Sequence, residues 1–170
     1  MNFMSALPRL FLGLVLLLAL TACGSFSSRS GNGADYNAQR PSLASATSSE
    51  IVLFALGLME TGYRFGGKNP QAGLDCSGMV AYVFAQAAGF RVSGSAADIA
   101  ARGRPVERAQ LRPGDLVFFN TRNQPFSHVG IYIGEERFVH APSTNGRVRI
   151  DHLNSTYYAA RFEAARSFFD

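Results

Sequence analysis

One cysteine stands at the start of a helical pattern near the middle of the chain. Cys76 lies in the run DCSG at positions 75–78, and apolar residues then recur at helical spacing: Met79, Val80, Val83, Phe84 and Ala87. This spacing gives the predicted helix one buried face. The free N–H groups and the dipole at a helix N-terminus stabilise an anion, and the thiolate is the nucleophilic form of cysteine. The pattern therefore indicates a nucleophilic thiol at Cys76.

A nucleophilic thiol needs a base, and the candidate base is His128, which begins the run HVGIYI. In a strand, the alternation of this run puts Val129, Ile131 and Ile133 on one face and His128, Gly130 and Tyr132 on the other. A histidine at the start of such a strand can face the N-terminus of a helix packed over the sheet. Proton transfer from Cys76 to His128 would form a thiolate–imidazolium pair, so we expect the pKa of Cys76 to lie below its ordinary value.

The base in turn needs a group that orients its ring, and the candidate is His140, which ends an expected strand at 137–140. A short turn at 134–136 would join this strand to the one that begins at His128 and bring the two imidazoles together. His140 would then fix the tautomer of His128. Because a neutral histidine is a weaker orienting acceptor than a carboxylate, three further groups stay open as alternatives: Asp151, Asn145 and Asn154.

Helical patterns precede strand patterns in the rest of the sequence. Helices are expected at 48–61 before Gly62, from Cys76 to Gly89, and at 95–102. Short strands are expected at 116–119, 128–133, 137–140, 147–150 and 161–168. Helices followed by strands with short connections predict an α+β fold with an antiparallel sheet.

The first 22 residues have the features of an export signal. Arg9 precedes an apolar run at 10–20 that is too short for a comfortable membrane span, and the segment ends in LTAC. This ending resembles the lipobox of bacterial lipoproteins, which implies cleavage before Cys23, lipid on Cys23 and a membrane anchor. In such lipoproteins an aspartate after the cysteine marks inner-membrane retention. Because Gly24 stands there, we expect the outer membrane, at the periplasmic face of the cell envelope.

Composition divides the remaining chain into a linker and one domain. Residues 23–47 are rich in Ser, Gly, Asn and Ala, which is typical of a flexible tether, and 48–170 suit one compact domain. The net charge is +4, the basic residues are scattered, and no nucleic-acid motif is present, so no nucleic-acid partner is expected. Lipid on Cys23 would leave Cys76 as an unpaired thiol in an exported protein, which again points to function.

Five segments, in order, resemble the NlpC-type family of bacterial cell-wall cysteine peptidases. They are YRFGG at 63–67, DCSG at 75–78, RPGDLVFF at 112–119, SHVGIY at 127–132 and FVHA at 138–141. The resemblance implies a papain-like α+β fold with N-terminal helices packed on an antiparallel sheet, and a triad of Cys76, His128 and His140. It also implies hydrolysis of peptide bonds in peptidoglycan stem peptides or cross-links through a thioester acyl-enzyme, with no cofactor or metal.

The same resemblance implies roles for groups around the nucleophile. The backbone N–H of Cys76 and the hydroxyl of Tyr63 would stabilise the tetrahedral oxyanion. Asp75 and Ser77 would bind polar groups of the substrate. Alternatively, these two side chains only cap the helix, as Asp and Ser commonly do.

Other interpretations fit the sequence less well. The run GYRFGGK at 62–68 fits a phosphate-binding loop, but Asn69 stands where that loop needs Ser or Thr. His128, His140 and His152 lack the spacing of zinc ligands, so no metal is expected, and His152 is interpreted as a surface residue. Two functions remain as alternatives: an N-acetylmuramoyl-L-alanine amidase or acyl transferase with the same triad, and a non-catalytic peptidoglycan-binding lipoprotein. A regulatory protein would suit a wall hydrolase, but the sequence identifies none.

Overall fold

The computed structural model of the chain describes residues 43–144 and 146–169, and its first element is helix α2 (Leu43–Gly57). Ile51, Ala55 and Leu58 are buried at i, i+4 and i+7, so one face of this helix packs against the core. The helix starts five residues before the predicted domain boundary and ends before Gly62. The expected signal peptide and most of the expected tether lie outside the described residues. Within the described part, no helix is long and apolar enough to cross a membrane.

The helix that carries the thiol has the expected limits but not one uniform geometry. Helix α3 (Cys76–Val83) continues as a π-helical turn, η2 (Phe84–Ala88), and Gly89 ends it with a φ of 70° in the left-handed region. Phe84, fully buried in η2, packs edge-on against Phe90 and Phe168 and stacks on Phe169. These contacts join the end of this helix to the C-terminal residues of the domain.

Two short features complete the helical side of the domain. Strands β1 (Lys68–Asn69) and β2 (Gly73–Leu74) form a small hairpin before α3, which the sequence did not predict. Helix α4 (Ala96–Arg102) agrees with the prediction and begins with a capping box, in which Ser95 and Asp98 bond each other's backbone N–H groups.

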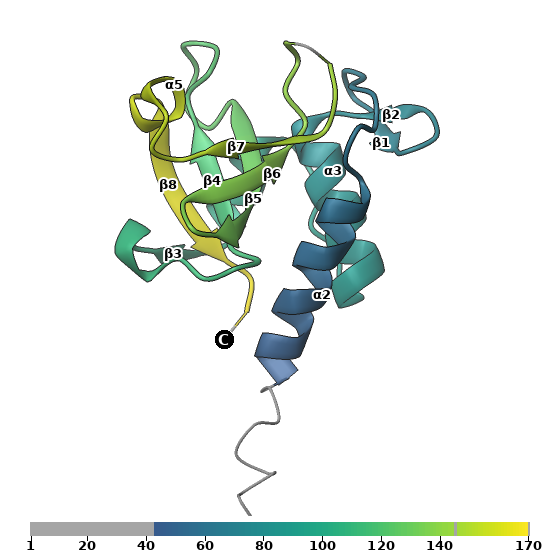
Figure 1. Cartoon of the computed structure of the whole chain (residues 1–170), viewed down its shortest axis with the longest axis horizontal. Helices are drawn as coiled ribbons and strands as arrows, with labels where there is room; N and C mark the ends of the chain where they lie inside the picture. Colours follow the sequence, from purple (N-terminus) through teal and green to yellow (C-terminus); the bar gives the residue numbers. More distant parts are fainter. Residues whose placement is uncertain (1–42, 145, 170) are drawn as a thin grey trace, which may run out of the picture. The chain divides into compact units, whose positions relative to one another are not determined.

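The second half of the domain is a six-stranded antiparallel sheet in the order β3-β8-β4-β5-β6-β7 (Figure 1). Five strands correspond to the expected ones: β4 (Leu116–Phe119), β5 (His128–Gly134), β6 (Arg137–His140), β7 (Arg149–His152) and β8 (Phe162–Ser167). The strand β7 lies two residues later than the predicted 147–150. Three short elements were not predicted, namely β3 (Arg104–Val106), the 3-10 turn η3 (Arg108–Gln110) and α5 (Thr156–Ala159). Helices before an antiparallel sheet confirm the α+β prediction.

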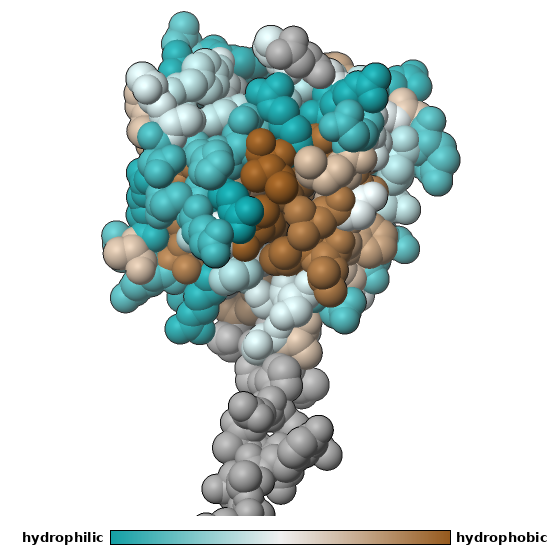
Figure 2. Space-filling view, viewed as in Figure 1, coloured by the Kyte–Doolittle hydropathy of each residue, from teal (hydrophilic) through white to brown (hydrophobic). Residues whose placement is uncertain are grey.

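The sheet separates two apolar clusters. The larger one lies between the helices and the sheet and includes Val80, Ile131 and Val139. The smaller one lies on the other sheet face, where α5 covers it, and includes Phe119, Tyr132, Phe138 and Tyr158. The predicted alternation of β5 is therefore confirmed, because Val129 and Ile131 belong to the helix-side cluster and Tyr132 to the other. Apolar side chains also reach the surface over α2, where Leu53 is 63% exposed (Figure 2).

A tight turn joins β5 to β6 and sets the register of the two histidine-bearing strands. Gly134, Glu135 and Glu136 all have positive φ, the backbone that the primed two-residue hairpin turns require. Across the hairpin Ile131 pairs with Val139, which brings the start of β5 beside the end of β6. His128 and His140 therefore lie at the same end of the sheet.

Candidate active site

The thiol of Cys76 lies at the first position of α3, and Asp75 holds that end of the helix in place. One carboxylate oxygen of Asp75 accepts hydrogen bonds from Gly78 N at 2.6 Å and from the Ser77 hydroxyl at 3.0 Å. The other oxygen accepts from Gly66 N at 2.9 Å. Asp75 is thus the N-cap of α3 and also ties the helix to the preceding loop, so the capping interpretation is confirmed for Asp75, whereas the Ser77 hydroxyl donates to the Asp75 carboxylate and caps no backbone group.

Two glycines let that loop approach the helix closely. A Cβ on Gly78 would lie 1.9 Å from the carbonyl oxygen of Gly67, and a Cβ on Gly67 would lie 2.2 Å from that of Gly73. The same Gly67 carbonyl accepts a hydrogen bond from Asp75 N at 3.1 Å. Gly67 of the run YRFGG and Gly78 of the run DCSG are therefore required by backbone contact, and this contact fixes the position of the thiol.

The two histidines are hydrogen-bonded to each other at the end of the sheet. His128 Nε2 lies 2.7 Å from His140 Nδ1, and the two rings meet edge to face. Both residues are buried, His140 completely. Gly130 makes room for this arrangement, because a Cβ there would lie 2.5 Å from Phe138 Cδ2 and 3.3 Å from His140 Cβ.

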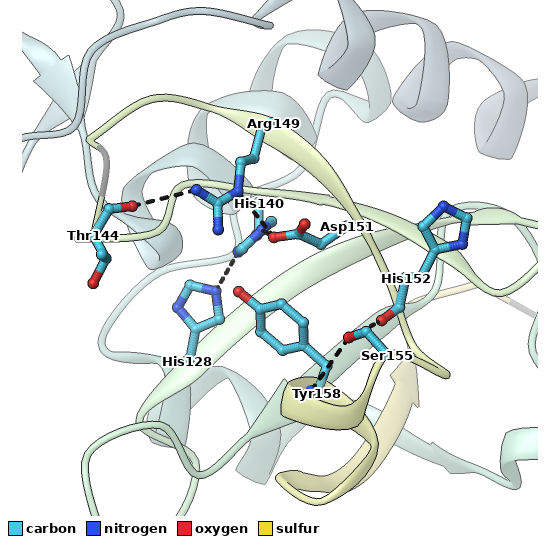
Figure 3. A network of polar contacts seen from close by, with 8 residues as sticks. All are labelled: His128, His140, Thr144, Arg149, Asp151, His152, Ser155 and Tyr158. Carbon is cyan, nitrogen blue, oxygen red and sulfur yellow. Dashed lines mark hydrogen bonds and ion pairs between the residues drawn. The ribbon is translucent and has the colours of Figure 1, made fainter.

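Behind His140 the network continues to a carboxylate and a guanidinium on β7 (Figure 3). His140 Nε2 lies 2.8 Å from Asp151 Oδ2, and Arg149 Nε donates to that same oxygen at 2.9 Å. Arg149 Nη1 also donates to the carbonyl of Thr144 at 3.4 Å. Burial raises the pKa of Asp151, but the hydrogen bonds from His140 and Arg149 outweigh it and lower this pKa to about 2. Asp151 is therefore a carboxylate at neutral pH.

The thiol and the first imidazole face one cleft. A cavity of about 340 Å³ is lined by Cys76 and His128 together with Tyr63, Asp75, Ser77 and Arg122, among others. A second cavity of about 400 Å³ is lined by His128 and by Arg149, Asp151, Tyr157 and Tyr158. Thr121, His128 and Ser143 line both cavities, so His128 stands at their common boundary.

Burial sets the protonation of the two central groups. It raises the pKa of the Cys76 thiol; the backbone N–H of Val129 opposes the shift, and the charge of Asp75 adds to it. Burial also lowers the pKa of His128 well below its ordinary value, and the charges of His140, Arg122 and Arg149 lower it further. A neutral thiol therefore faces a neutral imidazole at rest, and the expected lowering of the Cys76 pKa is wrong for this resting structure.

The remaining predicted site residues are placed as follows. Tyr63 lines the cleft, and burial, followed by the charges of Cys76 and Asp75, raises the pKa of its hydroxyl. His152 is exposed and lies apart from the bonded pair of histidines (Figure 3), as predicted. Asn154 is also exposed, and Asn145 lies outside the described residues. No cluster of three or more metal-binding side chains occurs among residues 43–144 and 146–169.

Two arginines of the site were missed in the sequence. Arg149 could have been found, because it lies in the expected strand at 147–150. Asp151 lies just beyond that strand, and β7, which extends to His152, places Arg149 and Asp151 on the same face as His140. Arg122 lies in the loop 120–127, where no periodicity applies. Only the folded chain shows that this loop lines the cleft beside Cys76.

A thiol at a helix N-terminus, facing a histidine oriented by a further polar group, is the arrangement found in papain-like cysteine hydrolases. The model of the NlpC/P60 family matches residues 60–167. The chain therefore belongs to the NlpC/P60 family.

Named relatives and solved structures agree with this assignment. The chain is 36% identical over 107 residues to murein DD-endopeptidase MepH of Escherichia coli strain K12, covering 61% of this chain and 40% of that protein. It is 42% identical over 107 residues to gamma-DL-glutamyl hydrolase of Bacillus subtilis strain 168, covering 62% and 26%. The chain thus spans less than half of either relative. The NlpC/p60 domain of the peptidoglycan hydrolase SagA superposes with a TM-score of 0.62 at 29% identity, covering 71% of this chain and 98% of that domain.

Proposed function

We propose that this protein is a cysteine endopeptidase that hydrolyses peptide bonds in peptidoglycan stem peptides or cross-links. The observation that carries the proposal is the shared cleft, which is lined by Cys76 at the N-terminus of α3 and by His128, while His140 Nδ1 lies 2.7 Å from His128 Nε2. Membership of the NlpC/P60 family supports the same reaction, since its relatives include a murein endopeptidase. Cys76 is the nucleophile, His128 the base and His140 the orienting group.

The reaction follows from these positions in two halves. His128 takes the thiol proton as Cys76 Sγ attacks the carbonyl carbon, and the carbonyl oxygen becomes an oxyanion. The Cys76 backbone N–H and the Tyr63 hydroxyl donate to this oxyanion. His128 then passes the proton to the leaving nitrogen, and the C–N bond breaks to give a thioester and a free amine. A water molecule, deprotonated by His128, attacks the thioester and releases the acid and the thiol.

The resting protonation supports general-base catalysis in the acylation step. A neutral imidazole has a lone pair ready for the thiol proton, whereas a preformed imidazolium would not. The depressed pKa of His128 keeps its ring neutral at physiological pH. The thiolate then forms as the substrate arrives, in a cleft where the N-terminus of α3 stabilises the negative sulfur.

The two cavities fit the two sides of the cleaved bond. Because the nitrogen of His128 that takes the thiol proton also protonates the leaving amine, the cleaved bond lies between Cys76 and His128, and the amine fragment extends from there to the far side of His128. That side is the cavity lined by Arg149, Tyr157 and Tyr158. The acyl fragment then occupies the Cys76 side, where Asp75, Ser77 and Arg122 supply polar groups for its peptide and carboxylate functions.

The names of the relatives indicate which kind of peptide bond is cut, but not its exact position in the stem peptide. One relative is named as a DD-endopeptidase and another as a gamma-DL-glutamyl hydrolase. Both names denote bonds that involve D-amino acids. We infer that this site takes such a bond, and the mass of the products identifies which one.

The test is digestion of purified sacculi by the full chain, kept in a mild detergent, with Cys76→Ala as the control. We expect fragments cut within the stem peptide or cross-link from the first protein and none from the second. Peptides free of sugar would instead identify an amidase. Binding to sacculi without new fragments from either protein would identify a non-catalytic wall-binding protein, and activity in Cys76→Ala would refute the triad.

We also propose that the protein is anchored by lipid on Cys23 at the periplasmic face of the outer membrane. The support is the sequence LTAC after a short apolar run, followed by Gly24 rather than aspartate. Metabolic labelling with a radioactive fatty acid tests the anchor, and membrane fractionation tests the location. Label that persists in Cys23→Ser, or protein that stays in the soluble fraction, would refute it.

A further inference from the structure

We propose that Asp151, held by Arg149, is a positioning residue of this site: it fixes the tautomers of both histidines so that His128 Nδ1 is left as the free base. The inference rests on the proposed cysteine-peptidase function and extends the triad by one residue. Its basis is the continuous network from Arg149 through Asp151 and His140 to His128 (Figure 3).

The tautomers follow from the bonds one at a time. An ionised carboxylate can only accept hydrogen bonds, so the 2.8 Å contact with Asp151 requires a proton on His140 Nε2. A neutral His140 then has a bare Nδ1, which accepts a hydrogen bond from His128. The 2.7 Å contact therefore places a proton on His128 Nε2. The remaining nitrogen of His128, Nδ1, is bare and is the only one that can take the proton of Cys76.

Without the carboxylate, the histidine pair has no fixed direction. His140 could then carry its proton on Nδ1 and donate to His128 Nε2, which would move the proton of His128 to Nδ1. That arrangement satisfies the same contact but leaves no lone pair for the thiol. Asp151 selects the productive direction because it lies at the end of the network and carries a full charge.

The same carboxylate offsets the charge that develops on His128 in the reaction. Charged and titratable groups surround the two histidines on several elements: Cys76 of α3 with its cap Asp75, Tyr63, Arg122 of the loop 120–127, Arg149 and Asp151 of β7, Tyr157 and Tyr158 of α5, and the partner histidine. Arg122 and Arg149 disfavour an imidazolium at His128, and Asp151 favours it.

Arg149 holds the carboxylate at the required angle. It binds the same oxygen as His140 does and is itself tied to the Thr144 carbonyl. Arg149 pairs with His140 on the neighbouring strand, and Asp151 pairs with Phe138. The side chains of these four residues therefore lie on the same face of the sheet. The side chain of Asp151 remains 29% exposed at the edge strand, so replacing it leaves no large buried void.

The test compares Asp151→Ala, Asp151→Asn and a matched control, Glu60→Gln, in the full chain. Glu60 also pairs with an arginine, Arg147, at 3.5 Å, but it is far more exposed and has no bond to a histidine. For Asp151→Ala we expect kcat to fall about 10- to 100-fold, the range for losing a hydrogen bond to a charged group, with KM within twofold. An asparagine oxygen can accept the same two bonds, so Asp151→Asn recovers kcat to within about tenfold of the wild type. Glu60→Gln leaves both constants unchanged.

Two further readouts separate positioning from a structural role. Asp151 raises the pKa of His128, so removing the Asp151 charge moves the acid limb of the pH profile of kcat/KM to lower pH. A purely structural defect lowers the activity without moving this limb. Nitrogen-15 NMR reports the tautomers directly, and the chain has only three histidines. We expect Nε2–H forms for His128 and His140 in the wild type and mixed forms in Asp151→Ala, with the exposed His152 as internal reference.

These experiments can refute the role of Asp151 and the proposed peptidase function separately. A proton on His140 Nδ1 in the wild type overturns the inference even when a variant fails to fold. So does an Asp151→Ala protein with wild-type kcat and wild-type tautomers. If the predicted tautomers are found in a protein that cleaves no sacculi, the positioning by Asp151 stands and the proposed peptidase function fails.

Discussion

Replacing Gly130 with alanine is the sharpest test of how the fold builds the histidine pair. The added Cβ would lie 2.5 Å from Phe138 Cδ2, 3.0 Å from the Val139 carbonyl oxygen and 3.3 Å from His140 Cβ. Carbon atoms in contact are normally about 3.5–4.0 Å apart, so the Phe138 ring must retreat by about 1 Å. It has little room, because Phe119 and Tyr158 pack on it with ring centroids 4.9 Å away.

Gly130→Ala is expected to lower both the stability of the domain and the catalytic rate. Overpacking of a close-packed core costs about 1–3 kcal/mol. For a domain of this size, that corresponds to a fall in melting temperature of about 4–12 °C. Movement of β6 also displaces His140 relative to His128, and a misplacement of about 1 Å in a catalytic arrangement costs on the order of 10²-fold in rate.

Thermal unfolding and kcat on a soluble muropeptide measure the two effects separately. The control is Gly57→Ala, since a Cβ at the end of α2 meets nothing within 4 Å. We expect the control to match or slightly exceed the wild-type melting temperature with unchanged kcat. A Gly130→Ala protein with wild-type stability and wild-type kcat would refute the packing argument.

Three further predictions concern the cleft. The alkylation rate of Cys76 can be measured against pH in a Cys23→Ser background. Because burial raises the pKa of the Cys76 thiol, the midpoint should lie above the ordinary thiol pKa of about 8.5. A midpoint below that value would contradict a neutral thiol beside a neutral imidazole. Tyr63→Phe should lower kcat by about 100- to 1000-fold with little change in KM, since it removes one oxyanion donor, and an unchanged kcat would exclude Tyr63 from that role. Asp75→Ala should lower the free energy of unfolding, measured in urea, by about 1–2 kcal/mol because the N-cap is lost. Asp75→Asn should keep most of the wild-type stability. Equal destabilisation by the two substitutions would argue that the charge of Asp75, rather than capping, matters.

Local patterns in the sequence determined most of the elements. The limits of β4 and β6 were predicted correctly, because each is a short run that the fold buries over most of its length. The start of α3 at Cys76 follows from a capping aspartate, and the end of the continuing turn η2 at Gly89 follows from a left-handed glycine; both act locally. The strand β3 and the hairpin β1-β2 were not predicted, since they are two or three residues long and form only because a partner strand lies beside them.

The sequence also contained the members of the site but not the order of their bonds. Cys76, His128 and His140 were found from residue types at the ends of predicted elements, and Asp151 was an alternative to His140 rather than a residue behind it. The register between β6 and β7 decides this point, because it places Asp151 against the far nitrogen of His140. Register depends on pairing between strands, which no single run of residues specifies.

The amino-acid sequence was therefore enough to predict the fold class and to single out Cys76 and the two histidines as candidates, since these depend on periodicity, caps and turns that act over a few residues. The protonation of Cys76 and His128 follows only from the folded chain, because burial by distant segments shifts their pKa values. The tertiary structure also decided that His128 stands between two cavities and that Asp151 ends the hydrogen-bond network. These features depend on which surfaces meet in the folded chain.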